Sequence, residues 1–116
     1  MEAVRLPDFR LGRVTISNRA ISQIVGYTAV ECYGVVGLDG GRVGRLFGRE
    51  DPTRGVEVEQ GSEGVAIALH VVVEYGLNLA EVASTIRSRV SYEVGRLTGL
   101  EVASVEVHIG DLRRGA

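Results

Sequence analysis

Apolar and polar residues alternate along the middle of the chain over a long stretch. Between residues 65 and 75, every odd position is valine, isoleucine, leucine or tyrosine, and the even positions are alanine, alanine, histidine, valine and glutamate. A two-residue period of this kind is typical of a β-strand with one buried face. Residues 56–60 alternate in the same way, and the sequence GSEG at 61–64 between the two segments predicts a hairpin. If Gln60 pairs with Val65, the apolar residues of both strands share one face, so we predict this register.

Two other segments show the three- and four-residue spacing of amphipathic helices. The first extends from Ser17, whose hydroxyl is placed to accept from the backbone N–H of Ala20, to a stop at Gly34. The second begins after the predicted N-cap Asn78 and ends at Gly99. Its predicted buried stripe consists of Leu79, Val82, Ala83, Ile86, Val90, Val94 and Leu97.

Two further strands complete the predicted sheet. Residues 11–16 are expected to form a short strand before the first helix, and residues 101–109 the last strand. Residues 34–44 are rich in glycine and are expected to be a flexible connection. The predicted inward residues of the last strand are Ala103, Val105, Val107 and Ile109.

The predicted fold class is therefore α+β, with the order strand-helix-strand-strand-helix-strand. Two helices are expected to pack on one face of a small, mostly antiparallel sheet. A chain of 116 residues has room for one hydrophobic core. We expect a lead-in at residues 1–10, a single domain at 11–110 and a short tail at 111–116.

The second face of this sheet has few charged residues at its centre. Small or apolar side chains alternate there with a histidine, and such a face often meets another subunit or a covering segment. We therefore predict a sheet-face contact made by Ala66, Ala68, His70 and Val72.

The amino-acid composition excludes several kinds of site and reaction. The single cysteine, Cys32, excludes an internal disulfide and a zinc cluster of cysteines, and it is expected to be a buried structural residue. All 13 basic side chains are arginines, so a lysine nucleophile is excluded. A net charge of -2 argues against nucleic-acid binding through bulk charge. Since no signal peptide or membrane-spanning apolar run is visible, we expect a cytoplasmic protein.

Two histidines are candidates for chemistry. His70 and His108 fall on the predicted outer face, and a His–Glu constellation can bind a divalent metal or perform acid–base catalysis. No tight ligand spacing such as H-x-x-x-H is present, and the sequence leaves open whether the two strands are neighbours. A solvated surface is the favoured interpretation, so we predict no enzymatic activity, no metal site and no cofactor. The glutamates expected on the same face are Glu57, Glu59, Glu74 and Glu106.

Residues 42–54 combine arginines with interleaved apolar residues. On a helical turn or two, these would separate into two faces, as in a small patch that contacts an anionic membrane surface, an acidic partner or RNA phosphate. A solvated connection with a few apolar anchors is the alternative. The predicted docking patch consists of Arg42, Val43, Arg45, Leu46, Phe47, Arg49 and Arg54.

Seven stretches of the chain form a long ordered pattern. They are GRVTIS at 12–17, GVVGL at 34–38, GVEVE at 55–59, VAIAL at 65–69, VVEYGLN at 72–78, TGLEV at 98–102 and VEVHI at 105–109. In order and spacing they resemble the alkaline shock protein family of bacterial envelope stress-response proteins. The resemblance covers roughly residues 10–110, and the second half is its more specific part.

The resemblance implies a non-enzymatic, cytoplasmic bacterial protein of cell-envelope homeostasis. It also implies self-association and a position near the membrane that is held through an anchored protein partner. Together with the unpartnered sheet face, it favours a binding or scaffold module that acts by edge-strand or sheet-face docking. Because the charged extensions of longer members are missing, a regulatory role linked to membrane lipid synthesis is one alternative. A small RNA-binding domain is another, disfavoured by the charge and by the lack of outer-face aromatics.

Overall fold

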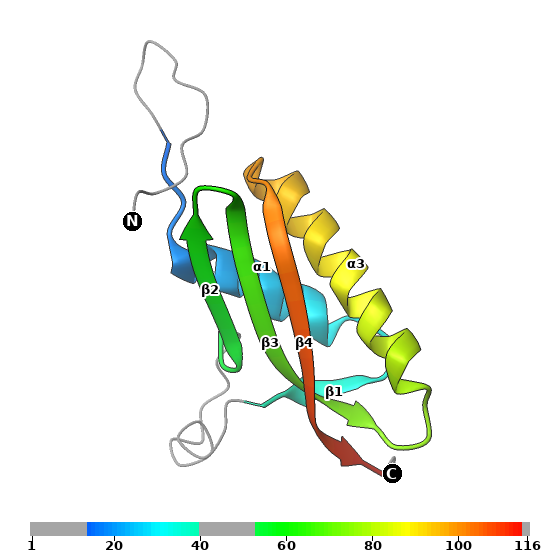
Figure 1. The fold of residues 1–116 in the computed structure, drawn as a ribbon. Helices are drawn as coiled ribbons and strands as arrows, with labels where there is room; N and C mark the ends of the chain where they lie inside the picture. Colours follow the sequence, from blue (N-terminus) through cyan, green and yellow to red (C-terminus); the bar gives the residue numbers. More distant parts are fainter. Residues whose placement is uncertain (1–13, 40–52, 115–116) are drawn as a thin grey trace.

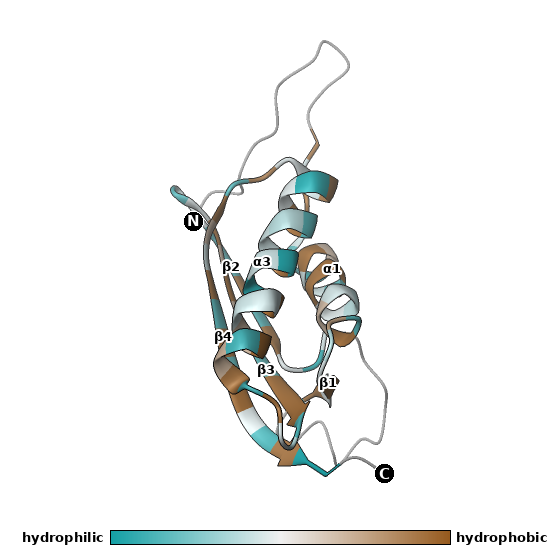
Figure 2. Ribbon diagram, turned by 90° about the vertical axis from the view of Figure 1, so that its right-hand side faces the viewer, coloured by the Kyte–Doolittle hydropathy of each residue, from teal (hydrophilic) through white to brown (hydrophobic). Residues whose placement is uncertain are grey.

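β3 is the centre of a four-stranded sheet. The computed structural model describes residues 14–39 and 53–114, and Figure 1 shows how they are arranged. β2 pairs with the first half of β3 and β1 with the second half, while β4 runs along the opposite edge. Both helices cover the same face of the sheet (Figure 2), so the α+β fold class is confirmed. In chain order the elements are α1 (Asn18–Val30), β1 (Val35–Leu38), β2 (Val56–Gly61), β3 (Gly64–Glu74), α3 (Leu79–Thr98) and β4 (Val102–Arg113).

The hairpin of β2 and β3 has the predicted antiparallel register. Gln60 lies opposite Val65, and Val58 lies opposite Ile67. The odd-numbered residues of β3 face the helices and form the centre of the core, each at most 1% exposed. Burying one such side chain contributes roughly 1.5–3 kcal/mol, so β3 holds both helices against the sheet. These β3 core residues are Val65, Ile67, Leu69, Val71 and Val73.

The starts of both helices and the end of α3 follow the predicted capping residues. The Ser17 hydroxyl accepts a hydrogen bond from the Ala20 N–H at 3.1 Å, and the Asn78 side chain accepts one from the Glu81 N–H at 3.1 Å. Gly99 ends α3 in the left-handed conformation, with φ of 76°, which glycine adopts without strain. Each helix therefore begins where its own sequence satisfies a terminal backbone N–H. The predicted stop of α1 at Gly34 is wrong, because α1 ends at Val30 with Glu31 as its C-cap, and Gly34, with φ of 90°, belongs to the turn into β1.

The buried face of α3 differs from the prediction at its ends. Leu79 and Leu97 are 37% and 54% exposed, whereas Thr98 is buried. The Thr98 hydroxyl donates to the Val94 carbonyl at 2.6 Å and accepts from the Leu100 N–H at 3.1 Å. This polar residue is thus satisfied in the last turn, and the remaining buried residues of α3 are Val82, Ile86, Val90 and Val94.

One strand lies elsewhere than predicted. Residues 11–13 of the expected first strand are outside the described residues, and Val14 to Ile16 form no strand. Instead, residues 35–38 of the expected flexible connection form β1, because Val35 and Leu38 pack against the core opposite β3. The segment at 14–17 before α1 is anchored by Gln60, whose Nε2 donates to the Ile16 carbonyl at 2.8 Å. The predicted lead-in at 1–10 lies outside the described residues.

β4 runs parallel to β3 because α3 crosses over between them. A β-bulge near its start interrupts the register between Val102 and Ser104, and Ala103 is the extra residue. Consequently Val102 packs against the core and Ala103 is exposed, so the predicted inward position of Ala103 is wrong. The strand continues to Arg113, beyond its predicted end at residue 109.

Candidate interaction surface

The outward residues of β2, β3 and β4 form the face of the sheet opposite the helices, and Figure 2 shows no described element over it. Ala66, Ala68 and His70 are half-buried here, and Val72 is 5% exposed. The four predicted contact residues therefore line up along β3. Glu57 and Glu59 from β2 flank them on one side, and Ser104 and Glu106 from β4 on the other. Whether this face binds a partner stays a prediction.

The two histidines are direct neighbours on this face. His70 on β3 is the register partner of His108 on β4, and their rings stack with centroids 4.7 Å apart and planes at 16°. His70 Nε2 lies 3.3 Å from a carboxylate oxygen of Glu57, and His108 Nε2 lies 3.8 Å from one of Glu106. Parallel pairing of β3 with β4 thus builds a polar row across three strands. No local sequence pattern predicts this pairing, since it depends on which strands are neighbours in the sheet.

The stack is unsuited to holding one metal ion. A metal bound by an imidazole nitrogen lies close to the plane of the ring, and two nearly parallel stacked planes share no such point. Each Nε2 also faces a different glutamate. Within residues 14–39 and 53–114, no group of three or more His, Cys, Asp and Glu side chains is placed to hold a metal ion. The imidazoles and carboxylates of this row can form hydrogen bonds and charge interactions with the surface of another macromolecule.

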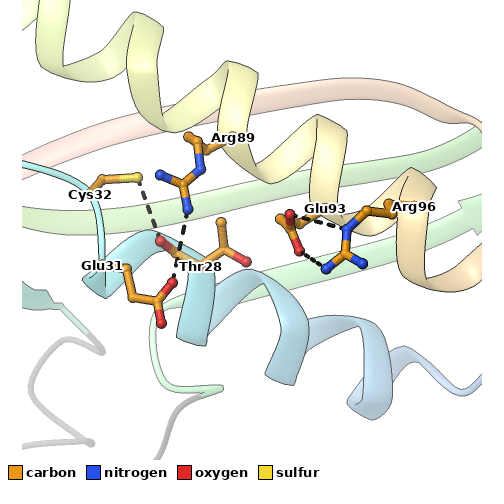
Figure 3. A network of polar contacts seen from close by, with 6 residues as sticks. All are labelled: Thr28, Glu31, Cys32, Arg89, Glu93 and Arg96. Atoms are coloured by element: carbon orange, nitrogen blue, oxygen red, sulfur yellow. Dashed lines mark hydrogen bonds and ion pairs between the residues drawn. The ribbon is translucent and has the colours of Figure 1, made fainter.

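Cys32 lies in a second polar cluster, between α1 and α3 (Figure 3). It is 4% exposed and sits just after the end of α1, where its Sγ donates to the Thr28 carbonyl at 3.5 Å. Burial raises the pKa of the Cys32 thiol, an effect that Arg89 opposes and Glu31 reinforces. Arg89 forms an ion pair with Glu31 at 3.9 Å. Because the reactive form of cysteine is the thiolate, this environment suits a packing role.

Glu93 and Arg96 form the other pair in Figure 3. Two hydrogen bonds join them, with nitrogen–oxygen distances of 2.8 and 3.3 Å. The hydrogen bond from Arg96 lowers the pKa of the Glu93 carboxyl, and the same contact raises the pKa of Arg96. The Arg96 side chain is 53% exposed and the Glu93 side chain 20% exposed, so the pair lies on the flank of α3, where water partly screens it.

A shallow pocket of about 160 Å³ lies beside the start of α3. Its only carboxylate is that of Glu81, and its only other ionisable group is the phenol of Tyr33. General acid–base or nucleophilic catalysis needs a nucleophile and a base within hydrogen-bond reach, and the lining of this pocket supplies no such pair. The other lining residues are Leu77, Asn78, Val82 and Thr85.

Most of the predicted arginine patch lies outside the described residues. Arg54 is described and is half-buried in the turn before β2. The rest of the patch lies outside the described residues: Arg42, Val43, Arg45, Leu46, Phe47 and Arg49. In the part of the chain that the structure describes, neither helix has the length and apolar character needed to cross a membrane.

Comparison with known proteins agrees with the resemblance seen in the sequence. Residues 8–114 match the model of the family of alkaline shock protein 23, described as having a cell envelope-related function. A Bacillus subtilis (strain 168) protein, "Uncharacterized protein YloU", is 34% identical over 111 residues, which cover 90% of this chain and 91% of that protein.

A second relative carries a functional name. The "Stress response regulator gls24 homolog" of Streptococcus pyogenes serotype M3 is 33% identical over 106 residues. The match covers 88% of this chain but only 59% of the streptococcal protein.

Among solved structures, a variant of the MamM CTD aligns with a TM-score of 0.53 over 82% of this chain and 98% of that chain. At 13% sequence identity, this likeness concerns the fold alone.

Proposed function

The chain belongs to the family of alkaline shock protein 23, and from that membership we propose that it is a non-enzymatic scaffold of the bacterial envelope stress response. It works in the cytoplasm close to the membrane, where it binds a membrane-anchored protein partner and further copies of itself. The family match over residues 8–114, with its cell envelope-related function, carries this proposal. The name of the streptococcal relatives supports the stress-response part.

The surface of the protein supports a binding role. The alanines at 66 and 68 form a half-buried apolar strip that is rimmed by the carboxylates of Glu57, Glu59 and Glu106. An apolar centre with a polar rim is the usual anatomy of a protein–protein interface.

The test uses a strain that lacks the gene and is complemented with variants. We expect the deletion strain to grow poorly after a shift to alkaline medium, and the wild-type gene to restore growth. The double variant Ala66→Arg/Ala68→Arg places two charges on the apolar strip and should neither complement nor appear in the membrane fraction. Ser62→Arg, in the exposed hairpin turn, is the matched control and should do both. Circular dichroism of each purified variant checks that it is folded.

The outcomes separate the proposal from its alternatives. A deletion strain as tolerant as its parent would contradict the envelope role, and full complementation by the double variant would contradict docking through this face. An altered fatty-acid profile without sensitivity to alkali would favour regulation of membrane lipid synthesis. Retarded migration of bulk RNA by the purified protein at moderate salt would favour RNA binding.

A further inference from the structure

β4 has one edge with no partner strand among the described residues. Its other edge pairs with β3 from Val65 to Glu74. The Val65 N–H donates to the Glu101 carbonyl, and the Tyr75 N–H donates to the Arg113 carbonyl, both at 2.8 Å. In a parallel ladder, alternate residues direct both backbone groups to the same neighbour. The residues of β4 that lie on the outer face therefore bond to β3. The helix-facing ones direct N–H and C=O to the free edge, namely Val105, Val107 and Ile109.

Such an edge is a template for another strand. Natural proteins protect long free edges with charged side chains such as lysine, with proline, with β-bulges or by keeping the strand very short. β4 runs for 12 residues from Val102 to Arg113 and contains neither lysine nor proline, and its two bulges, at Ala103 and Gly110, leave the stretch between them regular. Its free edge also ends beside an exposed apolar side chain, since Leu112 is 40% exposed.

We propose that the β4 strand of a second copy of this chain occupies this edge, antiparallel to the first, with the two-fold axis at Val107. This inference rests on the self-association in the proposed function and names the surface and the register. The two sheets would join into one, with the helices of both copies on the same side.

Face matching and charge select the register. When the two-fold axis passes through a residue, residues on the same face of the sheet lie opposite each other. When it passes between two residues, each outer-face residue lies opposite a helix-facing one. With the axis at Val107, Glu106 lies opposite His108 of the second copy. With the axis at Glu106, the Glu106 carboxylates of the two copies would lie opposite each other. With the axis at His108, the two His108 imidazoles would lie opposite each other. Of these three registers, only the one centred on Val107 opposes unlike groups.

The rest of the strand fits the same register. Val105 lies opposite Ile109, and Val102 lies opposite Leu112, so apolar residues meet on the helix side along the whole edge. The two bulges of β4, at Ala103 and Gly110, lie on either side of the central pairs, so the stretch of the strand around the axis is regular. The pair of Glu106 and His108 falls at a position without direct hydrogen bonds, where Cα atoms approach to about 4.5 Å and side chains are closest.

The experiment is a charge exchange read by analytical ultracentrifugation at low ionic strength. The wild type should dimerise. Glu106→Lys places a lysine opposite His108 of the second copy, and His108→Glu places a glutamate opposite Glu106 of the second copy. Each variant should therefore weaken the dimer about tenfold or more. The double variant Glu106→Lys/His108→Glu should recover the affinity. An equimolar mixture of the two single variants should form mixed dimers in preference to either homodimer, as native mass spectrometry would show. Glu59→Lys, on the outer face of β2, is the matched control and should leave dimerisation unchanged.

A second variant tests the edge without changing charge. The Val107 N–H points to the free edge, so Val107→Pro removes no hydrogen bond between β3 and β4 but blocks the proposed pairing. It should be folded and monomeric, with circular dichroism as the check. If the wild type dimerises and all these variants dimerise with the same affinity, the β4 edge is not the interface, although the self-association itself still holds. Mixed dimers without preference would overturn the register. A wild type that stays monomeric at all concentrations would overturn this inference together with the self-association of the proposed function.

Discussion

Gly64 is the position where the hairpin and the last strand are most sensitive to a single methyl group. Its φ of +122° lies in a region that other residues adopt only under strain. A Cβ at this position would lie 2.6 Å from the Glu101 carbonyl oxygen and 3.3 Å from the Ala103 backbone nitrogen. Both contacts are with backbone, so β4 itself would have to shift to accommodate the substitution Gly64→Ala.

The magnitude follows from two contributions. A non-glycine residue held in a sparsely populated backbone region costs about 1–3 kcal/mol. Displacing Glu101 also strains the 2.8 Å hydrogen bond that its carbonyl accepts from the Val65 N–H, which contributes about 1 kcal/mol. We therefore expect Gly64→Ala to lower the free energy of unfolding by about 2–4 kcal/mol, which lowers Tm by roughly 10–20 °C for a chain of this size.

The control lies directly across the hairpin. Gly61 pairs with Gly64, but a Cβ on Gly61 would meet nothing closer than the Gly64 carbonyl oxygen at 3.8 Å, an ordinary contact. Gly61→Ala should change the stability by less than about 1 kcal/mol in either direction. Urea denaturation followed by circular dichroism measures both variants. Equal losses for the two substitutions, or a neutral Gly64→Ala, would refute the reasoning from backbone conformation and close approach.

Further predictions concern single polar groups. Gln60→Ala removes the side chain that holds the segment before α1 and should cost about 1–3 kcal/mol in urea denaturation; an unchanged midpoint would contradict its anchoring role. Asn78→Ala removes the N-cap of α3 and should cost about 1 kcal/mol, whereas Asn78→Asp should retain most of the stability in thermal melts. Since burial raises the pKa of the Cys32 thiol, iodoacetamide at mildly alkaline pH should modify folded protein far more slowly than urea-unfolded protein; equal rates would show an accessible thiolate. Arg96→Ala removes the hydrogen bond that lowers the pKa of Glu93, so an NMR titration should show this pKa rise toward its ordinary value. The stability that the pair contributes is present at neutral pH and is lost as the pH falls through the lowered pKa.

Local sequence signals account for the parts of the fold that were predicted correctly. The hairpin register follows from a two-residue period on both sides of a short turn, since only one face of each strand is apolar. The helix starts follow from Ser17 and Asn78, each of which satisfies a backbone N–H three residues further on. In both cases the deciding interaction lies within a few residues along the chain.

Interactions between distant segments account for what was missed. β1 has only four residues, includes Gly37 and carries a bulge, so its sequence is too short to show a period, and pairing with β3 decides its conformation. The outward turn of Ala103 depends on a bulge in the β3–β4 register. The burial of Thr98 in place of Leu97 depends on hydrogen bonds at the end of α3. The histidine stack needs β3 and β4 to be neighbours, which only the assembled sheet decides.

The start of β4 couples the stability of the fold to the surface that would bind partners. β4 enters the sheet where the Val65 N–H donates to the Glu101 carbonyl at 2.8 Å, and a Cβ on Gly64 would meet the backbone of Glu101 and Ala103 there. From that point the register carries His108 to the position opposite His70 on the outer face. Because side chains alternate between faces, a shift of β4 by one residue would turn His108 toward the helices and bring its apolar neighbours to the outer face. A substitution that displaces the strand start should therefore disturb the polar row and the free edge together, even though it touches neither.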